Sequence, residues 1–409
     1  MKRPEILSPA GNLEKMRAAI LYGADAVYLA GEVFGMRAAA DNFTIEELAE
    51  AVAYAHERGV RVYLTVNTMP RENEYPLLEK YLESLREIPV DALIIADLGV
   101  LMLAKKILPE VEIHISTQAC SVSSADCRAW HSLGAKRVVL SRELSLEEIK
   151  EIRRNIPEEL EIECFVHGSM CVSYSGRCLL SNHLVSRDAN RGMCAQPCRW
   201  NYTARAYEIT EEKRPECSMP IEEIGGETFI MSSRDTCTIE HIPELVEAGI
   251  NSFKIEGRMK SAYYTAVVTN TYRMALDSYF SGEYEYDERW YRELESVSHR
   301  EYNTGYYFAD SHTDANISST TGYIREKAYL AVVQSYNSET GLALMTQRNK
   351  MKKGDSIELL TPGRVGEPLS VGELFDADMS PIEATPHPYM PFYMRMPFAV
   401  REGDIIRAV

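Results

Sequence analysis

Seven short apolar runs rich in β-branched residues recur through about the first 165 residues, and an amphipathic helical stretch separates each run from the next. Such runs are typical of parallel strands that are buried on both faces. Two of the helical stretches open with a capping box, formed by Thr44 with Glu47 and by Ser145 with Glu148. The alternation therefore predicts an α/β protein built on a parallel sheet. The seven runs are EILSPAG, DAVYLAG, VRVYLTVN, DALIIADL, VEIHISTQA, AKRVVLSREL and LEIECFVHG.

An eighth run of the same kind, GINSFKIEGR, occupies residues 249–258 and follows a helical stretch of matching type, HIPELVEA. Eight strand–helix units predict a (β/α)8 TIM-like barrel, with an insertion at about 168–230 between the seventh and eighth strands. An open, doubly wound sheet is the alternative. No G-x-G-x-x-G follows the first strand, which disfavours a dinucleotide-binding version of that alternative.

The pattern changes near residue 320 to short alternating strands separated by Gly, Pro and Asp, among them YLAVVQSY, GLALMTQ and DSIELLTP. This pattern predicts a small C-terminal all-β barrel module. We therefore divide the chain into a barrel domain, 1–318, and a β module, 319–409. The run RNKMKKGD makes a local basic turn in this module, which is more typical of a solvated hairpin tip than of a binding site.

The formal net charge is −17, which argues against a protein coated with basic surface for non-specific nucleic-acid binding. With 44 Lys and Arg residues, a local basic cleft remains compatible with that charge. The N-terminus lacks the apolar run of a signal peptide, and no stretch has the ~18 apolar residues of a membrane span. We therefore expect a cytoplasmic protein without a membrane partner.

Polar residues recur at the predicted C-terminal ends of the strands, where barrel enzymes place their catalytic groups. We therefore expect a pocket there. By alternation, His167 shares a strand face with Glu163 and Phe165, so we expect its side chain at the mouth of this pocket. The strand-end residues are Ser8, Asn12, Glu32, Arg37, Asn67, Asp97, Ser116, Thr117, Gln118, Arg142, Glu143, His167, Glu256 and Arg258.

Four of the nine cysteines cluster within 28 residues of the predicted insertion, in a segment rich in Ser, Gly, Asn and Arg. Cys171, Cys178, Cys194 and Cys198 have the spacing C-x6-C-x15-C-x3-C. Thiolates at short spacing suit an iron–sulfur cluster or a zinc ion. The spacing leaves open a cluster, a zinc ion or unligated thiols, and Cys217 or Cys237 as a substitute for one ligand. The sequence contains neither H-E-x-x-H nor G-x-S-x-G, which disfavours a hydrolase.

The segment ECFVHGSMCVSYSGRCLLS, residues 163–181, resembles the signature of the U32 peptidase (collagenase-like) family. Other blocks that resemble the family are LSPAGN, GADAVYLAGEVFGMRAAADNF, VYLTVNT, DALIIADLG, STQA and INSFKIEGRMKS, so the resemblance covers nearly the whole chain. The signature positions matched are Glu163, Phe165, Gly168, Ser169, Cys171, Gly176, Cys178 and Ser181.

The resemblance implies iron–sulfur chemistry of O2-independent hydroxylation rather than proteolysis, since branches of the family act on tRNA, ribosomal RNA or ubiquinone precursors. GMCAQPCRW and the C-terminal module are most similar to the branch that forms 5-hydroxyuridine at the tRNA wobble position and requires prephenate. The resemblance thus implies tRNA as partner, prephenate as co-substrate, and a [4Fe-4S] cluster on Cys171, Cys178, Cys194 and Cys198. A protease, or a hydroxylase of ribosomal RNA or of a ubiquinone precursor, is the alternative.

Prephenate is a dicarboxylate, and arginine binds carboxylates in a bidentate manner. Arg37, Arg142 and Arg258 all lie at predicted strand ends that face the same mouth. Tyr174 lies between two of the cysteines and could stack on an extruded uridine. The sequence leaves open a homo-oligomer or association with a paralogous chain. We expect catalytic roles for His167, Glu256 and Arg258, and substrate binding by Arg37, Asn67, Gln118, Arg142 and Tyr174.

Overall fold

Eight parallel strands form a closed barrel, because the last of them pairs with both the seventh and the first. The computed structural model describes residues 2–36, 41–171, 173–174, 176–199, 208–211, 214–220, 222–224, 227–229, 233–282, 284–309, 323–324 and 327–409. The predicted barrel is confirmed, and the open sheet is excluded. The strands are β1 (Glu5–Pro9), β2 (Ala26–Ala30), β3 (Arg61–Val66), β4 (Ala92–Ile95), β5 (Glu112–Ile115), β6 (Arg137–Val139), β7 (Glu161–Ser169) and β13 (Ser252–Ile255).

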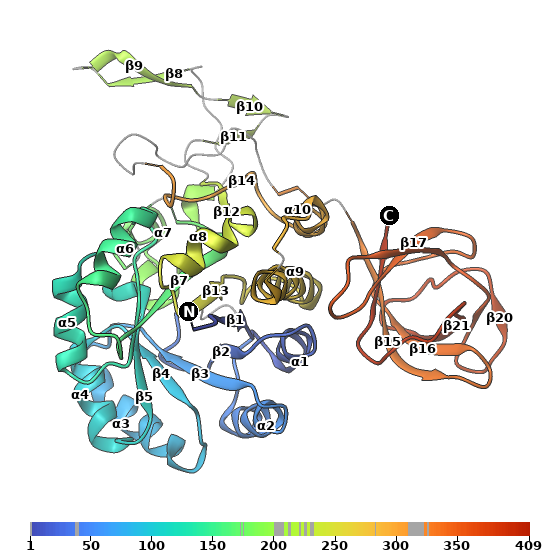
Figure 1. Ribbon diagram of the computed structural model, residues 1–409, viewed down its shortest axis with the longest axis horizontal. Coiled ribbons are helices and arrows are strands. Elements are labelled where there is room, and N and C mark those ends of the chain that lie inside the picture. The colour runs from blue at the N-terminus through green and yellow to red at the C-terminus, as the bar shows by residue number, and fades with distance from the viewer. Residues whose placement is uncertain are drawn as a thin grey trace.

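Helices surround the barrel, as Figure 1 shows. Both predicted capping boxes are present, on α2 and on α6. The longest helix, α9 (Ala262–Ser281), follows β13 and packs on α1. The remaining helices are α1 (Leu13–Leu21), α2 (Ile45–His56), α3 (Tyr75–Ser84), α4 (Leu98–Ile107), α5 (Ser124–Ser132), α6 (Leu146–Arg154), α8 (Ile242–Glu247) and α10 (Glu288–Glu295).

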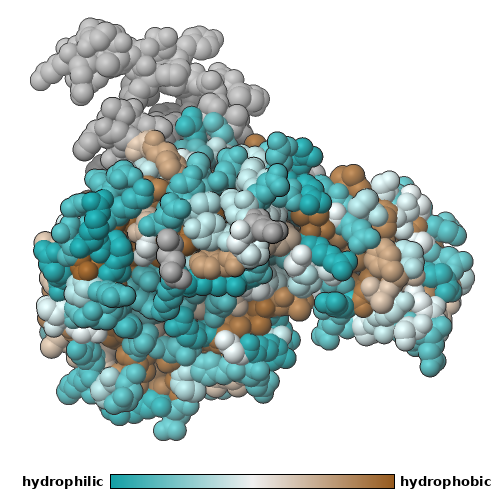
Figure 2. Space-filling view, in the orientation of Figure 1, coloured by the Kyte–Doolittle hydropathy of each residue, from teal (hydrophilic) through white to brown (hydrophobic). Residues whose placement is uncertain are grey.

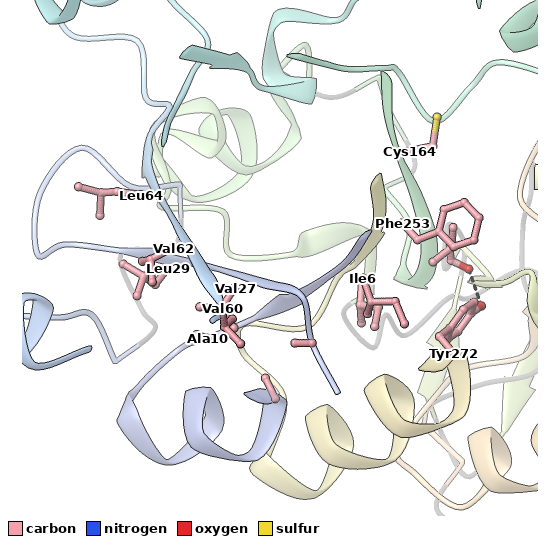
Figure 3. Close-up of a cluster of buried hydrophobic side chains, with 14 of the residues drawn as sticks. Ile6, Ala10, Val27, Leu29, Val60, Val62, Leu64, Cys164, Phe253 and Tyr272 are labelled. Atoms are coloured by element: carbon pink, nitrogen blue, oxygen red, sulfur yellow. Dashed lines mark hydrogen bonds between the residues drawn. The ribbon is translucent and has the colours of Figure 1, made fainter. Parts of the chain in front are cut away.

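The main core lies between the strands and the surrounding helices. Alternate strand residues such as Ile6, Val27 and Phe253 point outward into this layer, as Figure 3 shows beside the helices. The intervening residues point into the barrel, where Leu7, Tyr28 and Ile94 belong to a second, smaller apolar cluster. The parity of a strand residue therefore decides whether its side chain supports a helix or lines the barrel interior.

Charged side chains fill the end of the barrel interior at which the strands begin. The buried Arg137 guanidinium contacts the carboxylates of Glu5 and Glu163. Glu163 also accepts a hydrogen bond of 2.5 Å from Lys254 Nζ. Burial by itself would raise the pKa of Glu163, but the attraction of Lys254 and Arg137 outweighs it and lowers the pKa below its usual value. This ionic network therefore holds β1, β6, β7 and β13 together inside the barrel.

An insertion leaves the barrel at the end of β7 and returns through β12 (Asp235–Cys237), which pairs antiparallel with that end of β7. Asp235 is buried and pairs with Arg300, whose Nη2 lies 2.6 Å from the carboxylate. Both ends of the insertion are thus fixed at the C-terminal mouth of the barrel. Its elements are α7 (Leu180–Val185), β8 (Glu208–Glu211), β9 (Arg214–Pro220), β10 (Glu222–Ile224) and β11 (Glu227–Phe229); β14 (Tyr302–Asn303) pairs with β12.

The C-terminal module is an antiparallel eight-stranded half-barrel with a core of its own. It lies beside the barrel (Figures 1 and 2) and packs on its helices, because Tyr22 donates to the carbonyl of Leu360 and Arg407 pairs with Glu293. The predicted boundary at 318–319 lies outside the described residues. The strands are β15 (Tyr329–Asn337), β16 (Leu342–Gln347), β17 (Ser356–Leu360), β18 (Glu367–Ser370), β19 (Leu374–Phe375), β20 (Pro381–Ile382), β21 (Pro391–Arg395) and β22 (Ile405–Ala408).

Among the residues that the structure describes, no helix has both the length and the apolar character needed to cross a membrane.

Candidate functional site

A polar cavity of about 50 Å³ lies inside the barrel at the C-terminal ends of the strands. Its lining includes five of the residues predicted to act at the site: Asn67, Gln118, Arg142, Glu256 and Arg258. The structure therefore brings together side chains from β3, β5, β6 and β13. The other lining residues are Tyr28, Met36, Thr65, Ile94, Ser116, Thr117, Phe165 and Lys254.

Hydrogen bonds fix the amide side chain on one wall of this inner cavity. Asn67 donates through Nδ2 to Ser116 Oγ at 3.1 Å and accepts from the backbone amide of Met36 at 3.2 Å. Ser116 Oγ also accepts from the backbone amide of Gln118 at 3.2 Å. Because Asn67 has both a donor and an acceptor engaged, its orientation is determined before any ligand binds.

Three cations and one carboxylate line the inner cavity among its described residues: Arg142, Lys254, Arg258 and Glu256. Arg142 lies over the Phe165 ring at 4.0 Å and donates through Nη1 to the carbonyl of Ser169 at 2.6 Å. The buried Arg258 lies 3.5 Å from Thr65 Oγ1, and Tyr28 lies 3.3 Å from Glu256 Oε2. The excess of positive charge suits an anionic ligand that binds through carboxylate or phosphate oxygens.

A glycine allows β7 to pass close to Glu256. Gly168 has φ +110, and a Cβ at that position would lie 2.4 Å from the carbonyl oxygen of Glu256. The amide of Glu256 also donates to the carbonyl of His167 at 2.8 Å. Any side chain at residue 168 would therefore displace the end of β13 that carries Glu256 and Arg258.

A second, outer cavity of about 150 Å³ lies against the inner one and shares Met36, Gln118 and Arg142 with it. All four cysteines of the quartet line this outer cavity, as does the predicted Tyr174. Residues of the insertion form most of its wall, including α7 and two short 3-10 helices, η4 (Ala189–Arg191) and η5 (Pro197–Arg199). The quartet is thus assembled at the mouth of the barrel, directly beside the positively charged cavity.

Contacts with the barrel hold the cysteine-bearing loop over the mouth. Gly176 has φ +74, and a Cβ there would lie 2.5 Å from the carbonyl oxygen of Gln118. Farther along the loop, Arg191 forms an ion pair with Glu74. Cys178 is held in turn, because Asn190 Nδ2 donates to its carbonyl at 3.0 Å. The position of the loop therefore depends on close backbone approach as well as on charge.

None of the four quartet cysteines forms a disulfide within the described part of the chain, and two of them, Cys171 and Cys194, are exposed. The amide of Gln196 lies 3.3 Å from Cys194 Sγ, which is a contact of the kind that tunes metal-bound sulfur. The described residues hold no group of three or more His, Cys, Asp or Glu gathered tightly enough for a single metal ion. Four thiols around one cavity fit a cubane cluster, because each thiolate then binds a different iron.

The two substitute ligands considered from the sequence lie elsewhere. Cys237 is buried in the core behind β7, and burial raises the pKa of its thiol to about 12. It does not line the outer cavity. Cys217 lies on β9, in a part of the insertion whose side chains are outside the described residues.

His167 does not face the cavity, so the prediction from strand alternation is wrong for this residue. A bulge between β7 and β13 places Val166 out of register, so that His167 pairs beside Ile255 and shares its outward face. The ring packs among Tyr264, Tyr272 and Tyr302, and burial lowers the pKa of His167 to about 3. The imidazole is therefore neutral, and its surroundings give it a packing role rather than contact with a ligand in the cavity.

Other strand-end residues have local structural roles. Asn12 and Asp97 cap α1 and α4, and Ser8 hydrogen-bonds to Thr269 at 2.8 Å. Arg37 lies outside the described residues. Sequence reasoning missed Lys254, although a lysine within the apolar run SFKI and two residues before Glu256 was a usable signal, since alternation places both on one face. Tyr28 and Thr65 were also missed, because they lie before the strand ends.

A family model described as Peptidase family U32 matches residues 11–317, and a model of the family's C-terminal domain matches residues 325–407. The chain belongs to the U32 peptidase family. Among the relatives of this U32 protein are the tRNA hydroxylation protein P1 of Bacillus subtilis strain 168, 37% identical over 95% of this chain and 90% of that protein, and the tRNA hydroxylation protein P of Escherichia coli K12, 37% identical over 88% and 87%. A relative named collagenase from Porphyromonas gingivalis W83 is 33% identical over 88% and 86%.

Proposed function

We propose that this U32 protein is an iron–sulfur enzyme that hydroxylates the wobble uridine of tRNA to 5-hydroxyuridine, without O2 and with prephenate as co-substrate. The observation that carries the proposal is the junction of the two cavities, where the four cysteines meet a pocket with three cations. Relatives named as tRNA hydroxylation proteins support RNA as the acceptor. The proposal places the protein in the cytoplasm, together with its tRNA substrate.

The residues present fit a [4Fe-4S] cluster held by Cys171, Cys178, Cys194 and Cys198. Such a cluster would supply electron transfer at the mouth of the barrel. Anaerobically purified protein should then be brown and contain about four iron atoms per chain. A colourless protein that holds one zinc ion would refute the cofactor and leave the acceptor to be tested separately.

The inner cavity fits one carboxylate-bearing end of a small co-substrate. Arg142 and Arg258 follow β6 and β13, the two strands that flank β7, and Asn67 adds an amide of fixed orientation. At about 50 Å³ the inner cavity has room for little more than such a group, so the rest of the molecule would extend into the outer cavity. This arrangement would hold prephenate between the positive pocket and the quartet.

The acceptor is tested by nucleoside mass spectrometry of tRNA from cells that lack this protein. We expect 5-hydroxyuridine to disappear from the wobble position and to return when the intact gene is supplied. Unchanged tRNA would refute the proposed acceptor, and the same digest of ribosomal RNA would then test the alternative hydroxylation.

Proteolysis is the second candidate, since one relative is named collagenase. Among the described residues that line the two cavities, no serine or cysteine is paired with a histidine, and His167 faces away from both. Peptide cleavage by pure protein that survives removal of iron would favour this candidate.

A further inference from the structure

We infer that the C-terminal module carries an RNA-backbone contact surface, formed by Arg348, Lys350, Lys352, Lys353 and Tyr389, which we call the basic-aromatic patch. The inference rests on the proposed function, because it names the part of the protein that would hold the RNA substrate outside the pocket.

The patch is strongly positive in a protein whose formal net charge is −17. Residues 348–355 contain four cations and one carboxylate, Asp355, which gives a local charge of +3. Lys350, Lys352 and Lys353 are exposed, and none of them forms an ion pair within the described chain. Glu373 pairs with Arg395 at 2.8 Å, which lowers the pKa of this carboxylate, and the more distant Lys353 adds only a weaker attraction. The three ammonium groups are therefore available to phosphates.

An exposed aromatic ring lies next to one cation of the patch, Arg348. Tyr389 has 68% of its surface exposed, more than any other large hydrophobic residue among those described. The Arg348 guanidinium lies 4.9 Å from the centre of the Tyr389 ring and 5.6 Å from that of Tyr329. Cations together with an exposed ring form the combination by which proteins hold single-stranded nucleic acid, through phosphate contacts and base stacking.

The patch is rigid. The backbone of Met351 exchanges hydrogen bonds with Thr385, donating to its hydroxyl and accepting from its amide. The amide of Lys352 donates to Asp355 Oδ2 at 2.7 Å, which closes the turn that carries the lysines. Tyr329 stacks on Tyr263 of α9 at 5.5 Å, so the base of the patch is braced against the barrel. Binding would therefore require little ordering of the protein.

Contacts also place the patch at the same end of the barrel as the two cavities. Arg348 forms an ion pair with Glu14, in the first turn of α1, and α1 begins just after β1 reaches the mouth. The neighbouring Lys15 donates to the carbonyl of Arg258, which lines the inner cavity, at 3.3 Å. An RNA that places one nucleotide in the mouth would thus have its flanking backbone close to the patch.

The test measures tRNA binding by fluorescence anisotropy between 50 and 200 mM salt, a range over which phosphate contacts change affinity strongly. The variant Lys350→Ala/Lys352→Ala/Lys353→Ala should bind at least about tenfold more weakly at the lower salt. Its slope of log K against log salt should be about 2–3 units shallower, because each lost phosphate contact removes ~0.7–0.9. The matched control, Lys80→Ala/Lys105→Ala/Lys106→Ala, changes exposed lysines on α3 and α4 and should leave affinity and slope unchanged.

Tyr389→Ala should weaken binding about fivefold to a hundredfold through lost stacking without changing the salt slope, whereas Tyr389→Phe should bind as the wild type does. Thermal unfolding of each variant checks that the module remains folded. Wild-type binding with an unchanged slope in the triple-lysine variant would overturn the patch and leave the proposed function standing. A wild-type protein that binds no tRNA at any salt would overturn both.

Discussion

The two ends of the barrel interior carry the same kinds of charged side chain, but among the described residues the numbers of cations and carboxylates match at one end and differ at the other. At the end where the strands begin, three carboxylates meet three cations: Glu5, Glu161 and Glu163 with Arg61, Arg137 and Lys254. At the mouth, Arg142, Lys254 and Arg258 line a cavity with one carboxylate, Glu256. Lys254 belongs to both sets.

This difference separates stability from binding. A matched buried network is tolerated because each charge offsets the desolvation of another. It fixes the positions of the strands and leaves no charge for a ligand. An excess of cations beside a cavity leaves binding energy for a ligand that the protein does not contain. Substitutions where the strands begin should therefore lower stability, whereas substitutions at the mouth should lower the affinity for a ligand.

Glu163→Gln should destabilise the protein by about 3–5 kcal/mol, because it leaves Arg137 and Lys254 buried without their shared carboxylate. Urea unfolding measures the loss. The control is Glu158→Gln, which changes an exposed residue just before β7 and should change the free energy of unfolding by less than about 0.5 kcal/mol. A loss below about 1 kcal/mol for Glu163→Gln would show that the network is not a structural element.

Arg258→Met should weaken binding of a dicarboxylate such as prephenate about 30-fold to 1000-fold, which corresponds to ~2–4 kcal/mol. Methionine keeps most of the volume and removes the charge. Titration calorimetry compares it with the exposed Arg86→Met, which should bind normally. Equal affinity in both variants would contradict the role of the mouth as an anion site.

Gly176→Ala should move the cysteine loop away from Gln118, because the new Cβ would meet a backbone carbonyl and because φ +74 is strained by about 1–2 kcal/mol for alanine. We expect a several-fold lower iron content after anaerobic purification, with little change in the melting temperature of the barrel. Gly354→Ala is the control, since it has a similar φ of +85 and no atom within 4 Å of its added Cβ. Full iron loading of the Gly176 variant would show that cofactor binding does not depend on the contact between the loop and Gln118.

The smallest effect concerns pH. Burial by itself would raise the pKa of Glu161, but Arg137 outweighs it and lowers the pKa to about 2. The folded state thus favours the charged carboxylate, so its contribution is complete above an unfolded pKa of about 4.3 and is lost as the pH falls toward 2. Glu161→Gln should therefore lose less stability than the wild type between pH 4.5 and 2 in urea unfolding. If the free energy of unfolding falls equally with pH in the variant and the wild type, residues other than Glu161 cause the acid sensitivity.

The barrel could be predicted from the sequence because its signal is repeated. Eight β-branched runs mark the strands and two capping boxes mark the starts of helices, and the structure contains all of them. The gathering of Asn67, Gln118, Arg142, Glu256 and Arg258 followed from the same rule, since parallel strands end at one face.

The failures have local causes. One extra residue in β7 turned His167 outward, and a bulge of that kind has no periodic signature in the sequence. Lys254 lies within β13 rather than at its end, so strand-end positions alone do not identify it, although its side chain contacts both the network and the pocket. For the basic turn at 348–355 the sequence predicts a solvated tip, which its exposed lysines do not contradict, but the sequence does not show that Arg348 reaches Glu14 of α1 at the mouth.

The most direct test of the account measures 5-hydroxyuridine in tRNA from cells that lack the native gene and express one of two cysteine variants. Cys178→Ala removes a thiol that lines the outer cavity, and Cys127→Ala removes a buried thiol on α5 in the helix-side core. The proposed function predicts that the modification is absent with Cys178→Ala and normal with Cys127→Ala. Normal 5-hydroxyuridine with both variants would contradict it.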